Sequence, residues 1–310
     1  ALVVTDPEGY AVYEGPAAGD TIEIEGIQPW SHAAPVLYHA VLTLRDADGV
    51  LQEVVPYDIG FRRFEMINGV MCLNGERVVF NGVNRHEWNA DRGRAIGADD
   101  MHAAMAVFKK NNINAVRTCH YPDQSLWYDL CDRNGIYMID ETNLESHGSW
   151  QKLGAVEPSW NVPGSLPEWK DCVVDRARSM FERDKNHAAV LIWSCGNESY
   201  AGEDILAMSQ FFHDHDPGRL VHYEGVFHCR AFDAISDMES RMYAKPWEIR
   251  EYLESHPKKP FILCEYMHDM GNSLGGMESY VRLADEFDQY QGGFIWDYMD
   301  QALRHTDALG

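Results

Sequence analysis

The side chains best suited to chemistry are acids, imidazoles and amides that come at or directly after the ends of apolar segments. Glu198 follows the segment AVLIWSCGN, and Glu265 lies near the end of PFILCEY. Any one such residue is more often structural than catalytic, but parallel strands would bring all of these ends to one face. The residues at these ends are Asn84, Arg85, His86, Glu87, Arg117, His120, Asp140, Glu141, Asn143, Glu145, His147, Asn197, Glu198, Glu224, Met242, Tyr243, Glu265, Tyr266, His268, Trp296 and Asp297.

Glu198 and Glu265 are the pair with the clearest chemical meaning. Cleavage of a glycosidic bond requires two carboxyl groups: one protonates the leaving oxygen, and the other attacks the anomeric carbon or activates water. On the fourth and seventh strands of a barrel the two acids would face each other across its mouth. The alternative is that both form buried ion pairs with Arg85 and Arg117, and the positions alone leave both interpretations open.

The elements that must position these residues are apolar strands alternating with helical segments from Arg63 onward. This alternation is typical of a parallel α/β fold. Helices are predicted after Asp99 and at 124–134, 170–185, 202–213, 247–255 and 276–288; in the first, Met101, Ala104, Met105 and Phe108 share one face. Strands are predicted at 78–85, 113–118, 136–143, 189–197, 220–225, 234–240, 260–266 and 292–300.

Eight strands with intervening helices predict the α/β fold class, a (β/α)₈ TIM barrel over residues 63–310. The segment before the fourth strand is long and contains WNVPGSLPEW (160–169), so an ordered excursion over the barrel mouth is expected. The chain stops about ten residues after the last predicted strand. The last outer helix is therefore expected to be absent.

Residues 1–62 have a different pattern, with partial alternation of apolar and polar residues in TIEIEGI (21–27), VLYHAVLTLRD (36–46) and LQEVVPYDI (51–59). About three strands are too few for a β-sandwich, which normally has about seven. The stretch is therefore interpreted as the C-terminal part of an immunoglobulin-like β-sandwich domain.

Composition excludes several classes of protein. The net charge of −23 would repel a nucleic acid, and no apolar run is long enough to span a membrane. The opening residues are not expected to form a signal peptide, although the missing initiator Met suggests an excised piece that could have lost one. Seven cysteines without CxxC pairs indicate a reducing compartment, so a cytoplasmic location is expected.

Several motifs resemble glycoside hydrolase family 2, with the closest match to its large bacterial β-galactosidases. The resemblance covers the chain from about Phe61 onward, in the family's order. The motifs are NGVNRHEWN (81–89), NAVRTCHYP (114–122), DETNLESHG (140–148), IWSCGNES (192–199), ILCEYMHDMGNSLGG (262–276) and QGGFIWDYMDQ (291–301).

The resemblance implies a retaining β-galactosidase that hydrolyses terminal β-D-galactosides such as lactose. Glu198 matches the acid/base and Glu265 the nucleophile, so the two carboxyl groups should lie about 5–5.5 Å apart. Tyr243 matches the residue that tunes the nucleophile, and Asn197 the residue that binds the sugar 2-hydroxyl. The remaining matched residues, which hold the sugar or stabilise the transition state, are His86, His120, His268, Trp296 and Met242.

A magnesium site is also implied, with Glu145, His147 and Glu198 as ligands. By itself Glu-x-His is a weak signal that is more often structural, and a His ligand is less usual for magnesium than oxygen ligands. A sodium ion is possible, but the family's sodium site depends mostly on residues outside this segment.

The family's β-galactosidases carry an N-terminal jelly-roll domain and further loops that complete the sugar pocket, and this segment lacks both. The segment alone is therefore expected to have little or no activity, and the parent protein is expected to be a homo-oligomer.

The alternative functions are a β-glucuronidase, a β-mannosidase or a sugar-binding barrel that has lost catalysis. A glucuronidase would commonly carry Asn-x-Lys near the nucleophile, and none follows Glu265. A metal-dependent amide hydrolase would need His-x-His on the first strand, where this chain has Arg85-His86.

Overall fold

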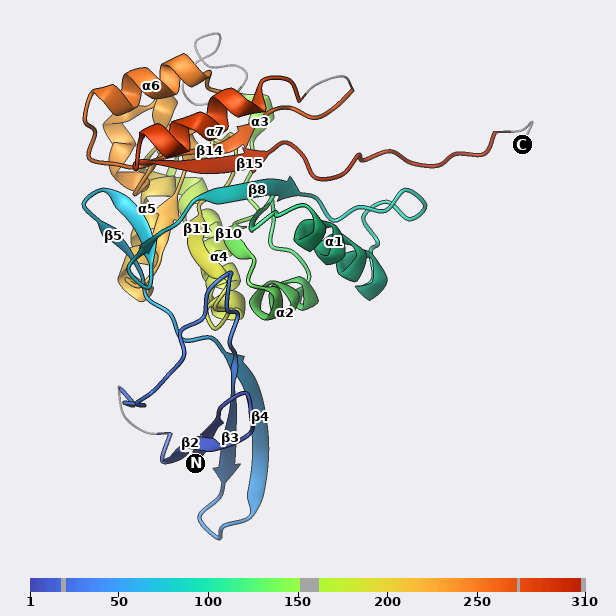
Figure 1. The fold of residues 1–310 in the computed structure, drawn as a ribbon, viewed down its shortest axis with the longest axis vertical. Helices are drawn as coiled ribbons and strands as arrows, with labels where there is room; N and C mark the ends of the chain where they lie inside the picture. The colour runs from blue at the N-terminus through green and yellow to red at the C-terminus, as the bar shows by residue number, and fades with distance from the viewer. Residues whose placement is uncertain (18–20, 151–161, 272–273, 308–310) are drawn as a thin grey trace.

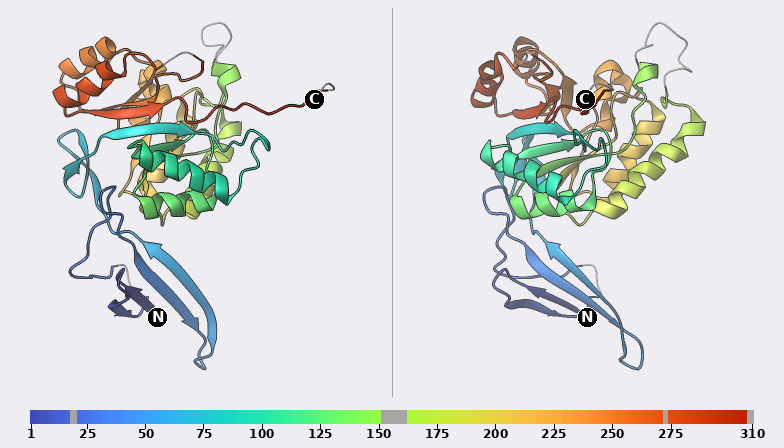
Figure 2. Two further views of the ribbon diagram at one scale, coloured as in Figure 1. Left: turned by 45° about the vertical axis from the view of Figure 1, so that its right-hand side comes forward. Right: turned by 90° about the vertical axis from the view of Figure 1, so that its right-hand side faces the viewer.

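The structure is a computed structural model that describes residues 1–17, 21–150, 162–271 and 274–307. A barrel of strands surrounded by helices forms the larger part, and a sheet of N-terminal strands projects from one side of it (Figures 1 and 2). The barrel strands, in chain order, are β8 (Phe80–Arg85), β9 (Ala115–Thr118), β10 (Tyr137–Glu141), β11 (Val190–Ser194), β12 (Leu220–His222), β13 (Glu239–Met242), β14 (Phe261–Tyr266) and β15 (Tyr290–Ile295).

The eight strands are parallel and nearly close into a ring, with the order β12-β11-β10-β9-β8-β15-β14-β13. The first and last barrel strands pair with Phe80 opposite Gly292, where a Cβ atom would lie 2.2 Å from the Phe80 carbonyl oxygen, so only glycine fits. At the remaining seam, the amide of Asp237 donates to the carbonyl of Val221 at 2.8 Å, and its carboxylate accepts from the Val221 amide at 2.7 Å. The predicted TIM-barrel fold is confirmed.

Helices cover the outside of the barrel close to the predicted ranges. Helix α1 buries Met101, Ala104, Met105 and Phe108, the face predicted from their spacing. None of the described helices is long and apolar enough to cross a membrane. The α-helices are α1 (Ala98–Lys110), α2 (Ser125–Asn134), α3 (His147–Trp150), α4 (Pro167–Asp184), α5 (Glu203–His215), α6 (Pro246–Glu254) and α7 (Met277–Glu286).

Two predicted segments of the barrel either differ from the structure or are only partly described. The strand predicted at 234–240 is wrong in position, because Ile235 ends the 3₁₀ helix η3 (Arg230–Ile235), which follows η2 (Glu224–His228), and β13 begins only at Glu239. Residues 151–161 of the excursion predicted before β11 lie outside the described residues, and the rest of the segment is described. Where the description resumes, the carbonyl of Val162 accepts a 2.5 Å hydrogen bond from Ser146 Oγ.

A three-stranded antiparallel sheet precedes the barrel and packs against its last strand. It consists of β5 (Phe64–Ile67), β6 (Val70–Leu73) and β7 (Glu76–Arg77). Buried Gln291 of β15 accepts from the Met71 amide at 2.7 Å and donates to the carbonyls of Met71 and Val78, both at 2.8 Å. Met71 is completely buried in the same core cluster as the barrel strands. The small sheet is therefore an integral part of the barrel core.

The N-terminal residues form a four-stranded antiparallel sheet with the order β2-β1-β3-β4. The predicted strands at 36–46 and 51–59 are confirmed as β3 (Tyr38–Arg45) and β4 (Leu51–Ile59), whereas β1 (Leu2–Thr5) and β2 (Ala11–Gly15) were not predicted. The strand predicted at 21–27 is wrong: these residues pair with no strand, and Ile24 and Ile27 instead pack against the small core of this sheet. The alternation of apolar and polar residues at 21–27 arises because one side of the segment packs against this core, although the segment pairs with no strand.

Two contacts tie the N-terminal sheet region to the barrel. Completely buried Trp30 donates from Nε1 to the carbonyl of Asp132 at 2.8 Å. Arg62 donates to the carbonyls of Ala188 and Val190 at 2.7 and 2.6 Å. These bonds satisfy backbone acceptors on the side of the barrel away from the strands' carboxyl ends.

Candidate active site

Arg117 of β9 lies at the centre of the polar residues that meet at the barrel mouth. Its side chain is completely buried and donates to Glu141 Oε2 at 2.7 Å, to Asn84 Oδ1 at 2.9 Å, to Glu265 Oε1 at 3.0 Å and to Asn197 Oδ1 at 2.8 Å. Burial opposes its charge, but Glu141 and Glu265 keep the pKa of Arg117 above its usual range. One fixed cation thus orients side chains from four other strands or strand ends.

Glu265 has hydrogen-bond donors on both carboxylate oxygens. Arg117 reaches Oε1, and the phenol of Tyr243 donates to Oε2 at 2.9 Å. The amide of Tyr243 also donates to the Glu265 carbonyl at 2.8 Å, which fixes the two residues relative to each other. Burial and the nearby Glu265 raise the pKa of Tyr243, so its phenol stays protonated. With only 5% of its surface exposed, Glu265 is a preorganised carboxylate at the mouth.

Glu198 lies in the turn after β11 and is more open, with 20% of its side chain exposed. Its φ of 38° is in the left-handed region, which non-glycine residues seldom adopt. Its amide donates to Glu224 Oε1 at 2.7 Å, and its carboxylate contacts the imidazole of His147. The preceding residue, Asn197, is the one that Arg117 holds, so the same guanidinium orients Glu265 and the residue beside Glu198.

His120 and Trp296 form a stacked aromatic pair at the mouth. Their rings are stacked with centroids 5.2 Å apart and an angle of 8° between planes. The His120 Nδ1 atom lies 2.8 Å from Glu141 Oε1, which fixes the ring. Stacked rings of this kind can support the apolar face of a sugar.

His86 lies beside that pair, with ring centroids 5.7 Å from His120 and 5.6 Å from Trp296. Burial and repulsion from His120 lower the pKa of His86 to about 4, so the ring is neutral at pH 7. Its Nδ1 atom lies 3.1 Å from the hydroxyl of Tyr121, which already accepts a bond from the Glu87 amide. This contact fixes the His86 ring beside Tyr121.

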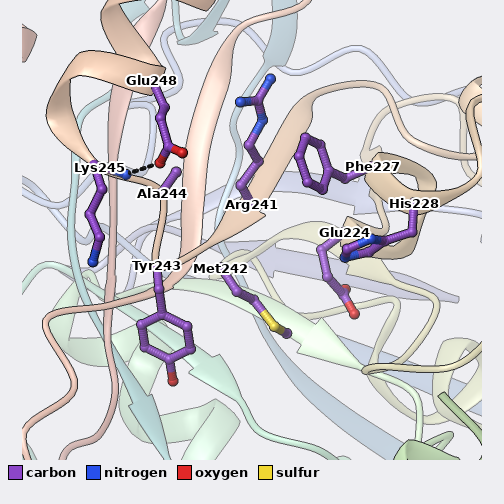
Figure 3. Close-up of a pocket in the computed structure, with 9 residues that line it drawn as sticks. All are labelled: Glu224, Phe227, His228, Arg241, Met242, Tyr243, Ala244, Lys245 and Glu248. Atoms are coloured by element: carbon purple, nitrogen blue, oxygen red, sulfur yellow. Dashed lines mark hydrogen bonds between the residues drawn. The ribbon is translucent and has the colours of Figure 1, made fainter. Parts of the chain in front are cut away.

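Met242 and Tyr243 border a cavity of about 320 Å³ between the ends of β12 and β13. Figure 3 shows their side chains and that of Glu224 pointing to the same side. His268 lies next to Tyr243, with ring centroids 5.9 Å apart. The cavity is lined by Glu224, Phe227, His228, Arg241, Met242, Tyr243, Ala244, Lys245 and Glu248.

Glu145, His147 and Glu198 form a cluster whose potential ligand atoms all lie within 4.8 Å of one another. Two carboxylates and an imidazole leave room for further oxygen ligands, so the donor set fits a divalent cation such as magnesium. The backbones of Glu145 and Asn197 form a β-bridge, and Asn197 Nδ2 donates to Glu145 Oε1 at 3.2 Å. The predicted ligand residues are thus held together by their own loops.

The alternative that Glu198 and Glu265 form buried ion pairs with Arg85 and Arg117 is correct for only one of the two acids. Glu265 pairs with Arg117, but Arg85 pairs with Asp123 at 2.5 Å, and Glu198 contacts His147. The structure therefore places the two acids in different environments, one buried between fixed donors and one in an accessible turn.

Two features of the site were not found in the sequence. Glu141 and Glu224 were recognised only as acids near strand ends, without the partners that the structure gives them. His222 was not singled out at all, although it is fully buried between the hydroxyls of Ser194 and Ser240, at 2.9 and 2.8 Å. The only available signal was a polar residue in an apolar segment, which indicates burial but not its partners.

Comparison with known families gives two matches that together span most of the chain. Residues 64–309 match the model described as glycosyl hydrolases family 2, TIM barrel domain, and residues 3–62 match the model described as glycosyl hydrolases family 2. The boundary between the two matched regions falls just before β5.

Curated relatives are highly similar but much longer. The chain is 64% identical over 281 residues to a β-galactosidase of Halalkalibacterium halodurans, covering 91% of this chain and 28% of that protein. It is 62% identical over 282 residues to a β-galactosidase of Clostridium acetobutylicum, covering 91% and 31%. It is 56% identical over 316 residues to a β-galactosidase large subunit of Lactobacillus acidophilus, covering 99% and 50%. The chain thus spans half or less of the length of these relatives.

Solved structures share the fold at lower identity. A β-glucuronidase from Ruminococcus gnavus in complex with D-glucuronic acid superposes with a TM-score of 0.80 and 20% identity, covering 99% of this chain and 57% of that one. At that identity, the likeness concerns the fold alone.

Proposed function

Since the chain belongs to glycosyl hydrolase family 2, we propose that it is the catalytic region of a retaining β-galactosidase, with Glu265 as nucleophile and Glu198 as acid/base. The observation that carries the proposal is the asymmetry of the two acids. Glu265 is buried between Arg117 and Tyr243, whereas Glu198 is accessible in a turn next to Asn197. The identity of 53–64% to relatives named β-galactosidase or its large subunit supports galactosides as the substrate class.

In the first step, Glu265 attacks the anomeric carbon while Glu198 donates its proton to the departing glycosidic oxygen. The bond to the aglycone breaks, and a galactosyl ester of Glu265 forms. Arg117 and Tyr243 hold the two Glu265 oxygens, so the carboxylate needs little reorganisation to attack. Glu198 is left as a carboxylate.

In the second step, Glu198 takes a proton from a water molecule whose oxygen attacks the anomeric carbon. The ester bond breaks, Glu265 regains its carboxylate, and galactose leaves with its original configuration. Two inversions give net retention, and a spacing of about 5–5.5 Å between the carboxyl groups remains a prediction.

The other residues that match the family motifs would bind the sugar. Asn197, fixed by Arg117, would hydrogen-bond the 2-hydroxyl, and the neutral His86 would hydrogen-bond a further sugar hydroxyl. Trp296 stacked with His120 would form the floor beneath the ring. Met242 and His268, both near Tyr243, would complete the pocket.

We also propose that Glu145, His147 and Glu198 hold a magnesium ion, since their donor atoms cluster closely. When bound, the ion would add positive charge beside Glu198 and stabilise the carboxylate that remains after Glu198 has given its proton to the leaving oxygen. A sodium site remains a prediction.

The relatives named large subunit support an enzyme of more than one chain, while an assembly of identical chains also remains a prediction. All seven cysteines are free thiols, which supports a reducing compartment such as the cytoplasm.

The test is a panel of nitrophenyl glycosides assayed with the full-length protein. The β-galactoside should be the best substrate, and methanolysis followed by NMR should give the β-methyl galactoside. Glu265→Gln should lower kcat by about 10⁴-fold or more, because it removes the nucleophile. Glu278→Gln, an exposed acid on α7, is the matched control. Full galactosidase rates in both Glu265→Gln and Glu198→Gln would refute the assignment.

A further inference from the structure

The turn that carries Glu198 is held from the neighbouring strand β12. Glu224, the second residue after β12, accepts the Glu198 amide hydrogen at 2.7 Å through Oε1. The adjacent Tyr223 accepts from the Ser199 amide at 3.0 Å and donates to the Ser199 carbonyl. Two consecutive side chains therefore bind three consecutive peptide units around Glu198 and Ser199.

This support matters because Glu198 has a φ of 38°. Side chains other than glycine seldom occupy the left-handed region, and such a conformation persists only where the surroundings fix it. On the other side, the Asn197 amide donates to the Leu144 carbonyl at 2.8 Å. The Glu198 amide itself has Glu224 as its partner, so Glu224 is the group that holds the unusual residue directly.

Glu224 uses only one of its carboxyl oxygens for this bond. The residue is 97% buried, with 3% exposed, and Oε2 has no hydrogen-bond partner among the described residues. The side chain lines the cavity beside Met242 and Tyr243 (Figure 3). The contact with the Glu198 amide therefore requires one acceptor oxygen, which a glutamine amide could equally supply.

We propose that Glu224 is a positioning residue for the acid/base. It acts through Glu198, because it fixes the left-handed turn that carries this residue. This inference rests on the proposed function, because it presupposes that Glu198 delivers a proton to the leaving group. Glu224 need not touch the substrate for this role. Its loss would misplace the Glu198 carboxyl while leaving Glu265 and its donors Arg117 and Tyr243 intact.

The test compares two β-galactosides that differ in their need for a proton. Cleavage of phenyl galactoside depends on the acid, whereas 2,4-dinitrophenolate leaves without protonation. Glu224→Ala should lower kcat/KM for phenyl galactoside by about 10²-fold, since a small misplacement can cost that much, and for the dinitrophenyl substrate by less than about threefold. Glu224→Gln, which restores an acceptor oxygen, should recover most of the phenyl galactoside rate.

Glu239→Ala is the matched control, since Glu239 of neighbouring β13 is a buried acid that pairs with Arg230 and Arg241 at 2.6 and 2.7 Å. Its loss should lower both rates by the same factor. The dinitrophenyl rate also measures how much enzyme is folded. Should Glu224→Ala be insoluble, Glu224→Asp, whose carboxyl falls short of the amide, should show the same selective loss.

Each outcome separates this inference from the proposed function. If the wild type cleaves no galactoside or Glu265→Gln keeps its rate, the proposed function is wrong and this inference falls with it. If the wild type is active and Glu265→Gln is inactive, equal losses on both substrates overturn the positioning role alone. A Glu224→Gln variant as impaired as Glu224→Ala would also overturn it.

Discussion

Arg117 donates a 3.0 Å hydrogen bond from Nη1 to Oε1 of Glu265, from a side chain that is completely buried. A charge removed from water in this way is stabilised only if its donors are matched by acceptors. Arg117 meets that condition through four acceptor residues on different strands or strand ends. The nucleophile is therefore oriented by a group that is itself fixed by the whole mouth of the barrel.

Arg117→Lys should impair both catalysis and stability, because one ammonium cannot reach all four acceptors. We expect kcat/KM to fall by about 10²–10³-fold and the free energy of unfolding by roughly 3 kcal/mol. Kinetics on nitrophenyl galactoside and urea unfolding would measure the two effects. Arg63→Lys is the control, since 72% of that side chain is exposed. A folded Arg117→Lys enzyme with the wild-type kcat would contradict the role assigned to Arg117.

Tyr243→Phe should lower kcat by about 10²-fold, because it removes the donor to Glu265 Oε2 that is worth that much at comparable sites. Stopped-flow kinetics should show slower formation of the galactosyl-enzyme. The control is Tyr252→Phe on α6, which removes a 3.1 Å hydrogen bond from the Tyr252 hydroxyl to the Lys259 carbonyl. Equal rates for Tyr243→Phe and the wild type would show that Arg117 alone suffices.

Magnesium binding should depend on Glu145 and His147. In isothermal titration with magnesium chloride, Glu145→Gln and His147→Ala should each weaken binding by about 10-fold or more, since each removes one of the clustered donors. Glu251→Gln, an exposed acid on α6, should bind like the wild type. Unchanged affinity in both site variants would place the ion elsewhere.

Stability should fall in acid partly through His222. Burial, reinforced by the positive charge of Arg117, lowers the pKa of His222 to about 3. The unfolded chain takes up a proton on this residue below about pH 6.5 while the folded protein does not, so folding is disfavoured as the pH falls. For a fully buried group this amounts to roughly 2 kcal/mol between pH 7 and pH 5.

His222→Gln should reduce this loss while keeping polar contacts with Ser194 and Ser240. Urea unfolding at pH 7 and pH 5 would compare its slope with that of the wild type and of His39→Gln, an exposed histidine. If His222→Gln loses as much stability between the two pH values as the wild type, His222 is not the source.

The sequence predicted the barrel well because its strands are buried on both faces, and β11 is apolar at four of its five buried positions. The strand predictions failed where an apolar residue packs against the core without pairing with a neighbouring strand, as at Ile24 and Ile235. In the site, motifs located Glu198 and Glu265, but nothing in the spacing indicated that Arg117 binds Asn197 as well as Glu265. Such contacts join residues 80 and 148 positions apart, so they depend on the closed barrel rather than on local pattern.

The bond between Gln291 and the small sheet at Met71 joins residues 220 positions apart. At about 5–20 residues per second, a ribosome needs roughly 10–45 seconds to add that length of chain. During this interval the small sheet has no Gln291 to bind, and one edge of β8 has no β15 beside it. Unpaired strand edges are templates for association with other chains. The first barrel strand is therefore made well before the last strand, which covers its open edge.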